Sequence, residues 1–379
     1  MSVTEDHGAD TASVVPKKGF QYYQDKYWND LDRVVRILNE RATGDPDRLW
    51  SEHLRDNYGP FRHALVLNCG NGWVERELVN RGVVASAVGI DVSADLLKDA
   101  RKEAAAAGLP LRYVQLDTNR AEFPDENFDL VVNHAAMHHV AYVDRVTRRV
   151  CELLAPDGVY VSWDYVGPHR NQYTALQWEH AWTANLGLAP DLRQVMRYPH
   201  LPTMMAGDPT EAVHSELIVP TIERYFRIEH HARLGGGVGY LLLTHNEAIH
   251  SRSQGDVDDA VQAVMAADGA LTDAHPETTL FSYIVARPEK EVLADTGRLA
   301  EWTAAEDDRE RRAAEAGGAY YPPTALGAIS EALVVAENAA SSPGPAREVV
   351  LAGTPGRVLA QVLGTRLRAK VSARIRRRR

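Results

Sequence analysis

The chain has 379 residues and a net charge of −10, and this negative overall field argues against a general nucleic-acid-binding protein. It contains two cysteines, Cys69 and Cys151, which are too few for a disulfide framework or a cysteine-rich zinc site. No apolar run approaches the roughly 20 residues of a membrane-spanning helix.

The N-terminal part of the chain divides at about residue 20. Residues 1–19 are small and polar without periodicity, so we predict a disordered segment. The segment also lacks the apolar core of a signal peptide, and we expect a cytoplasmic protein. Residues 20–60 show helical periodicity, with Leu31, Val34 and Leu38 on one face, and we predict an N-terminal helical cap.

The next hundred residues alternate between predicted strands and predicted helices. Short apolar runs suit buried parallel strands, and the segments between them have the spacing of amphipathic helices. The expected strands are residues 63–68, 86–91, 111–117, 128–133 and 158–164, and the expected helices are 72–82, 93–108 and 141–158. Strands separated by such helices form a parallel sheet, and ligands bind beyond the carboxyl ends of its strands.

The rhythm changes after Asp164. Two further strand-like runs, 226–234 and 278–288, complete a domain that we place at residues 61–287, with insertions at 165–215 and 235–278. For the glycine-rich stretch 235–240 we expect a mobile lid, close approach of the backbone to substrate, or a plain flexible loop. Beyond the domain we expect a helical extension at 288–336, a linker at 337–353 and a basic tail at 354–379.

The first expected strand ends in a glycine turn, Asn68 to Gly72. A P-loop requires a lysine and a serine or threonine directly after its glycines, and neither follows Gly72. A dinucleotide fingerprint requires a third glycine at the position that Glu75 occupies. A carboxylate in the first helical turn also disfavours a pyrophosphate, so we expect a ligand without phosphate groups.

Polar side chains end the next three strands in order: Asp91, Asp117 and Asn133. A carboxylate at the end of the second strand can accept hydrogen bonds from both hydroxyls of a ribose, and one after the third strand can accept from an adenine amino group. Each residue alone suits a turn or a helix cap. Together, in register with the glycine turn, they indicate a more specific site.

These motifs resemble those of the class I S-adenosylmethionine-dependent methyltransferases. The resemblance rests on LVLNCGNGW (65–73), GIDVS (89–93), LDTN (116–119), FDLVVNHAAMHHV (128–140) and LLAPDGVYV (153–161). It implies an α/β fold with a Rossmann-like, seven-stranded, mostly parallel sheet whose final strand is antiparallel. It also implies that S-adenosylmethionine is the cofactor, bound by Asn68, Gly70, Gly72, Asp91, Val92, Asp117, Thr118 and Asn133.

Two positions depart from the pattern of this family. Val66 stands where the family often has an acidic residue that contacts the methionine ammonium, and Asn68 stands where it often has a glycine. Asparagine tolerates a left-handed backbone better than most residues do. Because both departures concern the cofactor site, a non-catalytic scaffold subunit with this fold is an alternative to an enzyme.

The resemblance places His138 and His139 near the methyl group that would be transferred. Methylation of a hydroxyl requires alignment of the acceptor and removal of its proton, and histidine is the usual base near neutral pH. The catalytic candidates are His139, His138 and Asp164, with His139 first as the base. His134 and His138 have metal-ligand spacing, but we expect His134 in the turn after the fourth strand, which spoils this helical spacing, and we predict no metal.

Three stretches, residues 164–174, 208–220 and 235–243, are similar to a bacterial subgroup associated with glycan and natural-product biosynthesis. The similarity implies O-methylation of a hydroxyl on a sugar, glycan or glycosylated natural product; the alternative is N- or carboxyl-methylation of a small metabolite or peptide. The expected substrate-binding residues are Trp28, Tyr165, His169, Arg170 and Gln172. Core packing of Trp28 and an Asp164–Arg170 ion pair are the structural alternatives.

The stretch from Thr354 to Arg379 carries nine basic residues and no acidic residue. Its apolar residues, among them Leu359, Leu363 and Leu367, recur at helical spacing. This pattern is typical of an amphipathic helix on an anionic membrane surface. Docking on the acidic body of this chain or of a partner is the alternative.

Overall fold

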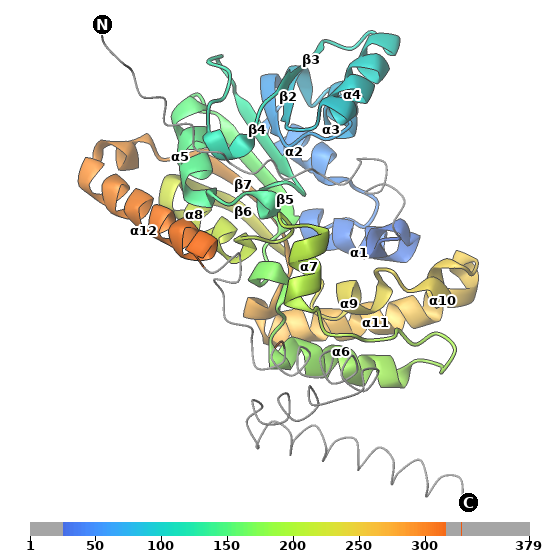
Figure 1. Ribbon diagram of the computed structural model, residues 1–379. Helices are drawn as coiled ribbons and strands as arrows, with labels where there is room; N and C mark the ends of the chain where they lie inside the picture. The colour runs from blue at the N-terminus through green and yellow to red at the C-terminus, as the bar shows by residue number, and fades with distance from the viewer. Residues whose placement is uncertain (1–25, 316–326, 328–379) are drawn as a thin grey trace, which may run out of the picture.

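The structure is a computed structural model that describes residues 26–315 and Gly327 (Figure 1). Its centre is a seven-stranded sheet with the order β3-β2-β1-β4-β5-β7-β6. The strands are β1 (Phe61–Leu67), β2 (Val84–Asp91), β3 (Leu111–Gln115), β4 (Leu130–His134), β5 (Val159–Tyr165), β6 (Phe226–Gly235) and β7 (Phe281–Pro288). Strands β3, β2, β1, β4 and β5 run parallel to one another, and β7 runs antiparallel to β5 and β6. The predicted Rossmann-like, mostly parallel fold with an antiparallel final strand is confirmed.

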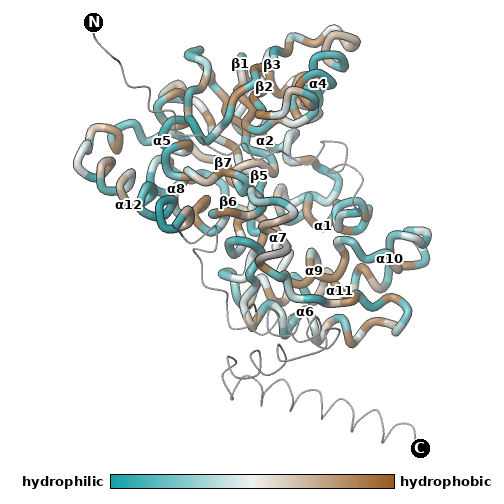
Figure 2. The backbone as a smooth tube through the Cα atoms, in the orientation of Figure 1, coloured by the Kyte–Doolittle hydropathy of each residue, from teal (hydrophilic) through white to brown (hydrophobic). Residues whose placement is uncertain are grey.

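Helices cover both faces of the sheet because its central strands are apolar on both sides. Along β1, Ala64 and Val66 belong to one core, and Leu65 and Leu67 belong to the other. The first core includes side chains of α3 (Trp73–Asn80) and α4 (Ala94–Ala106), and the second includes side chains of α5 (Val143–Leu153) and α8 (Ile218–Tyr225). Figure 2 shows the hydrophobic residues gathered in the central strands.

The described N-terminal part contains two main helices instead of one continuous helix. The first, α1 (Asp32–Thr43), ends at Gly44, where a φ of 82° gives the left-handed backbone typical of a helix end. The second, α2 (Trp50–Tyr58), begins after the intervening loop. Residues 1–19 lie outside the described residues, so their disorder stays a prediction.

The insertions supply helices that pack together beside α1 (Figure 1). They are α6 (Ala175–Gly187), α7 (Leu201–Gly207), α9 (Gly239–Leu243), α10 (Glu247–His250) and α11 (Gln254–Ala274). Single 3-10 turns connect other elements: η2 (Trp28–Asp30), η3 (Thr118–Arg120), η4 (Met137–His139), η5 (His169–Asn171), η6 (Ser215–Leu217), η7 (Pro276–Thr278) and η8 (Lys290–Ala294). The longest of the insertion helices, α11, contacts both α1 and α6 and so ties the insertions to the N-terminal helices.

The glycine-rich stretch 235–240 is held by a buried carboxylate. Asp268 on α11 is fully buried and accepts hydrogen bonds from the backbone N–H groups of Gly236, Val238 and Gly239 at 2.9 Å. Arg41 on α1 pairs with the same carboxylate at 2.7 Å. A β-carbon on Gly235 would lie 2.2 Å from Asp268 Oδ2, so glycine is required there for close approach. The structure therefore shows close approach of this backbone to a protein carboxylate and not to a substrate, and it gives no support to a mobile lid or a plain flexible loop.

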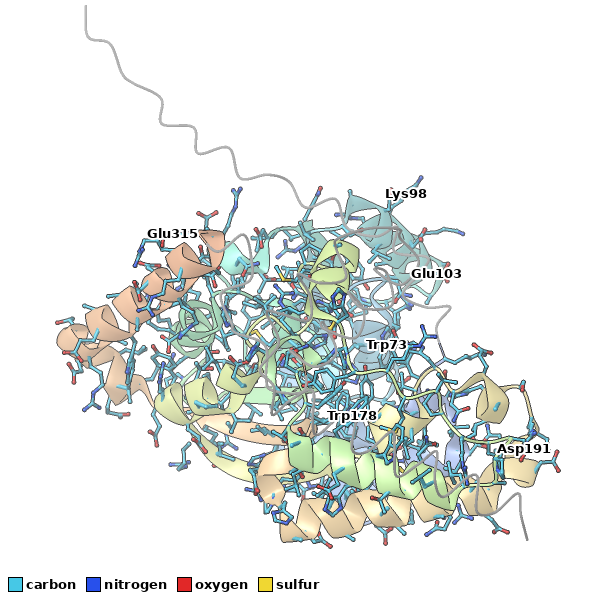
Figure 3. The ribbon with its side chains drawn as sticks, turned by 60° about the horizontal axis from the view of Figure 1, so that its bottom comes forward. Trp73, Lys98, Glu103, Trp178, Asp191 and Glu315 are labelled. Carbon is cyan, nitrogen blue, oxygen red and sulfur yellow. The ribbon has the colours of Figure 1, made fainter. Side chains whose placement is uncertain are left out.

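The described chain ends with α12 (Thr296–Glu315), which packs against α5 on the second face of the sheet. Figure 3 shows Glu315 of this helix and Lys98 of α4 on opposite flanks of the molecule. The predicted linker 337–353 and basic tail 354–379 lie outside the described residues, and membrane association of the tail stays a prediction. Among the described residues, no helix has both the length and the apolar character that crossing a membrane requires.

Candidate active site

The glycine turn after β1 adopts left-handed backbone at three positions. The φ angles are 45° at Asn68, 57° at Gly70 and 73° at Gly72. Asn68 therefore occupies the conformation that its side chain tolerates. A β-carbon on Gly72 would lie 2.4 Å from the hydroxyl oxygen of Tyr113, so the turn can lie against β3 only because this residue is glycine.

Asp91, the last residue of β2, joins this turn to the start of α4. Its Oδ2 accepts a hydrogen bond from the Gly70 N–H at 2.8 Å, and its Oδ1 accepts one from the Ser93 N–H at 2.8 Å. The side chain is mostly buried, and burial raises its pKa above the ordinary value against the opposing effect of these hydrogen bonds. Each oxygen keeps a further lone pair for a ligand hydroxyl.

The loops after β1, β3 and β4 are joined through Asn68. The hydroxyl of Thr118 donates to Asn68 Oδ1, and the Asn68 amide donates to the carbonyl of Ala136 at 3.1 Å. Asp117 caps η3 by accepting from the Asn119 N–H at 2.9 Å. These contacts give Asn68 and Thr118 clear structural roles and leave Asp117, which is half-buried, nearer the surface of the site.

Buried polar groups at the ends of β4 and β5 form one network around Asp164. Its Oδ2 accepts from the Asn133 amide at 2.9 Å and from the Met137 N–H at 2.8 Å, and its Oδ1 accepts from His138 Nδ1 at 2.6 Å. Burial opposes ionisation of Asp164, but the charge and hydrogen bond of His138, together with Asn133, outweigh it and lower the carboxyl pKa. Asn133 is 1% exposed, so the structure assigns it to positioning Asp164 and gives no support to a cofactor contact.

The two adjacent imidazoles on η4 differ in their protonation. Burial lowers the pKa of His138, but the charge and hydrogen bond of Asp164 outweigh burial and raise that pKa to about 9. Burial and the neighbouring His138 lower the pKa of His139. Near neutral pH His138 is therefore protonated and His139 is neutral. The centroids of the two rings are 4.1 Å apart.

Glu211 completes this corner of the site, and the sequence analysis did not single it out. Its Oε2 lies 3.9 Å from His138 Nε2 and 4.0 Å from His139 Nε2. The segment that carries Glu211 is fixed by backbone contacts, because the Val213 N–H donates to the His138 carbonyl at 3.0 Å and Arg170 donates to the Glu211 carbonyl at 3.0 Å. Glu211 lies in a predicted insertion without periodicity, so no pattern could have placed it here.

The metal-ligand spacing of His134 and His138 does not form a site. His134 is the last residue of β4, and its ring lies among those of Trp50, Trp73 and Trp163. Burial lowers its pKa to about 4. Among the described residues, the histidine and acidic side chains whose ligand atoms converge are His138, His139 and Glu211.

Most of the predicted substrate-binding residues are buried. Trp28 is 3% exposed and packs on the ring of Phe281 at 5.3 Å, so the structure favours core packing for it. Tyr165 donates its hydroxyl hydrogen to the Pro168 carbonyl at 3.0 Å, and Gln172, at 1% exposed, donates its amide hydrogen to the Arg170 carbonyl at 3.1 Å. These contacts hold the predicted insertion together.

The remaining two candidates, His169 and Arg170, lie on η5. Burial lowers the pKa of the half-buried His169 to about 4. Asp164 forms its ion pair with His138, so the alternative Asp164–Arg170 pair is wrong. Arg170 instead donates a hydrogen bond to the Glu211 carbonyl at 3.0 Å.

Two exposed apolar side chains flank the glycine turn. Trp73, at the start of α3, is 43% exposed, and Val92, after β2, is 54% exposed. In Figure 3 Trp73 lies inward of Lys98 and Glu103, which mark the outer surface of α4. Exposed apolar groups at the strand ends are suited to contact the flat face of a bound ring.

Comparison with known proteins shows what the strands and loops around the site resemble. Residues 65–162 match a family described as a methyltransferase domain. These residues form a class I S-adenosylmethionine-dependent methyltransferase domain. An uncharacterized methyltransferase of Mycobacterium tuberculosis is 31% identical over 105 residues, which cover 28% of this chain and 51% of that protein. The chain therefore spans about half the length of that relative.

A second relative is the fatty-acid O-methyltransferase of Mycolicibacterium smegmatis. It is 30% identical over 120 residues, which cover 32% of this chain and 42% of that protein. Among solved structures, an S-adenosylmethionine-dependent methyltransferase from Mesorhizobium loti is 20% identical, and the match covers 63% of this chain and 96% of that chain with a TM-score of 0.38.

The cofactor of this methyltransferase domain is S-adenosylmethionine, and the residues present fit it. The glycine turn brings backbone close to the end of β2, where the Asp91 carboxylate lies in position to accept hydrogen bonds from ribose hydroxyls. Glu75 on α3 is completely buried behind the turn, neither of its carboxylate oxygens has a hydrogen-bond partner, and burial raises its pKa to about 7. A carboxyl group in this place suits a ligand without phosphates.

Proposed function

We propose that the chain methylates a hydroxyl of a sugar, glycan or glycosylated natural product. The observation that carries the proposal is the cluster of His138, His139 and Glu211 beside the ends of β4 and β5, in a domain that uses an activated methyl donor. A hydroxyl is a weak nucleophile, and such a cluster supplies groups that can take its proton.

Different residues near the glycine turn bind the ribose and the adenine of the cofactor in this proposal. Asp91 accepts the ribose hydroxyls, while Val92 and Asp117 contact the adenine ring and its amino group. When bound, S-adenosylmethionine supplies a methyl group activated by the positive sulfonium. Gly70 and Gly72 keep the turn free of side chains where the cofactor approaches the backbone.

His139 is the first candidate for the base, on geometric grounds. Its Nδ1 lies 3.2 Å from the Thr210 hydroxyl oxygen, and Thr210 in turn donates to Asp208 at 2.7 Å. This chain of contacts orients the ring and leaves Nε2 to face the acceptor. His139 is 26% exposed compared with 12% for His138, so it is the more accessible of the two side chains.

Methylation of a carboxyl group is the second candidate reaction, because one relative is a fatty-acid O-methyltransferase. The polar groups of the cluster favour a hydroxylated acceptor, since an alkyl chain would have to displace water from charged side chains without replacing its hydrogen bonds. A scaffold subunit that lacks turnover is the alternative outside the enzymes.

The first test is calorimetric titration of the full chain with S-adenosylmethionine and S-adenosylhomocysteine. We expect micromolar dissociation constants, followed by methyl transfer to members of a panel of sugars and glycosides and not to fatty acids. Absence of binding to a folded protein would favour the scaffold alternative. Transfer to fatty acids alone would overturn the hydroxyl assignment.

The second test is the variant His139→Ala. We expect the turnover number to fall by about 100-fold or more while the affinity for S-adenosylmethionine stays unchanged, because the histidine acts on the acceptor. His180→Ala, which removes an exposed histidine of α6, is the matched control and is expected to leave both quantities unchanged. Normal turnover of His139→Ala would remove this residue from the reaction.

A further inference from the structure

The side chains of His138, His139 and Glu211 have the arrangement of a metal site with open positions. One potential ligand atom from each residue lies within 4.8 Å of the other two. Both histidine Nε2 atoms face the same carboxylate oxygen, at 3.9 and 4.0 Å. Two imidazoles and one carboxylate form a known ligand set for divalent transition metals and leave positions for other ligands.

Each imidazole also has a hydrogen-bond partner at Nδ1, as metal-binding histidines commonly do. His138 Nδ1 lies 2.6 Å from the carboxylate oxygen of Asp164, and His139 Nδ1 lies 3.2 Å from the hydroxyl oxygen of Thr210. A hydrogen bond at one ring nitrogen of a metal-binding histidine selects the tautomer and orients the other nitrogen toward the metal. These contacts therefore leave Nε2 of each ring directed to the common point with Glu211, where an ion binds by displacing the proton on His138 Nε2.

The cluster can close around an ion with a small movement. Metal–ligand bonds of about 2.0–2.2 Å in a tetrahedral site bring ligand atoms to about 3.4 Å from one another, so the present cluster must contract by roughly 1 Å. The Glu211 side chain is 30% exposed, and rotation about its bonds can supply that movement. The backbone of its segment is already held by Arg170 and by the Val213–His138 hydrogen bond.

We propose that His138, His139 and Glu211 bind one divalent transition-metal ion. In the tetrahedral site its fourth, open position takes the oxygen of the acceptor hydroxyl. The assignment of the acceptor rests on the proposed function, whereas the metal site rests on the cluster alone. With the ion bound, His139 is a ligand and no longer the base, and the positive charge of the ion promotes loss of the acceptor proton to solvent.

The test is calorimetric titration of the untagged full chain with Zn²⁺, accompanied by Co²⁺ absorption spectra. We expect one Zn²⁺ per chain and visible Co²⁺ bands that Zn²⁺ abolishes. Glu211→Gln and His139→Ala are each expected to lower the Zn²⁺ affinity at least tenfold and to remove the bands. His180→Ala is the matched control, with wild-type affinity expected, and thermal unfolding checks that each variant is folded.

The outcomes separate the metal site from the proposed function. S-adenosylmethionine binding is titrated in the same preparations without metal. A chain that binds S-adenosylmethionine but no Zn²⁺, or whose Glu211→Gln and His139→Ala variants bind Zn²⁺ as the wild type does, overturns the metal site and leaves the methyltransferase proposal standing. A chain that binds Zn²⁺ at this cluster but no S-adenosylmethionine supports the metal site and counts against the proposed function.

Discussion

At the scale of single residues, Asp91 combines a structural task with a proposed ligand-binding task. Its carboxylate holds the Gly70 and Ser93 N–H groups and so fixes the glycine turn against the start of α4. The same carboxylate is the proposed acceptor for the ribose hydroxyls. Removing it therefore both loosens the turn and deletes a charged hydrogen-bond acceptor.

We expect Asp91→Ala to weaken S-adenosylmethionine binding by about 10- to 100-fold, because a hydrogen bond to a charged group contributes about 1.5–3 kcal/mol. Calorimetry measures the effect. Asp99→Ala, which removes an exposed carboxylate from the same helix α4, is the control for a general change in charge. An affinity equal to that of the wild type would reject the ribose assignment.

The residues of the proposed cofactor side were predictable from the sequence, and those of the proposed acceptor side were predictable only in part. Asn68, Gly70 and Asp91 follow strands whose apolar runs are unmistakable, and parallel strands bring their ends to one edge. Glu211 reaches the site through tertiary contacts, namely the hydrogen bonds that Arg170 and Val213 make. No local periodicity encodes such contacts, so the sequence indicated the two histidines and missed the carboxylate between them.

At the scale of elements, α1 and α11 are joined by two ion pairs that differ in burial. Arg41 and Asp268 lie 2.7 Å apart with side chains 18% and 0% exposed. Arg33 and Asp258 also pair, but their side chains are 40% and 39% exposed. The buried pair also carries three backbone N–H groups of the glycine-rich stretch, whereas the other pair is accessible to water and salt.

We expect Asp268→Asn to lower the free energy of unfolding by roughly 2–4 kcal/mol, because it leaves Arg41 without its counter-charge beside a buried amide. Urea denaturation measures the change. Asp258→Asn is the matched control on the same two helices, and a much smaller effect is expected because water screens that pair. Equal effects of the two substitutions would show that Asp268 does not hold the glycine-rich stretch in the way its contacts indicate.

At this scale, the order of helices and strands was predicted correctly, but the length of the N-terminal helix was not. The N-terminal periodicity suggested continuous helix, and Gly44 with the loop after it divides that region into α1 and α2. The stretch 235–240 suggested mobility because it is rich in glycine. Its glycines instead allow the backbone to approach Asp268, a reason that depends on a helix about 30 residues further along the chain.

At the scale of the whole molecule, α12 links the outer face of the sheet to the acceptor side of the site. Glu306 of α12 accepts hydrogen bonds from the N–H groups of Asp144 at 2.8 Å and Arg145 at 3.2 Å, at the start of α5. Glu310, one turn further, pairs with His214 at 2.8 Å, three residues beyond Glu211. The helix thus supports the segment that carries the acceptor-side carboxylate.

The attachment of α12 is expected to depend on pH through Glu306. Burial raises the pKa of this carboxyl from 4.5 to about 7, against the opposing hydrogen bonds from α5. The unfolded chain releases this proton near pH 4.5 and the folded chain only near pH 7, so the folded state binds more protons between these values. The contribution of Glu306 to stability is therefore fully present below about pH 4.5 and is lost as the pH rises through 7.

We expect Glu306→Gln, which is neutral at every pH, to remove this dependence. The difference in unfolding free energy between wild type and variant should shift by roughly 2–3 kcal/mol in favour of the variant from pH 5 to pH 8, as measured by urea denaturation at both values. Other titrating groups cancel in this difference because they are common to both proteins. Glu301→Gln, an exposed position on α12, is the control, and a constant difference for Glu306→Gln would mean that its carboxyl ionises at an ordinary pKa despite burial.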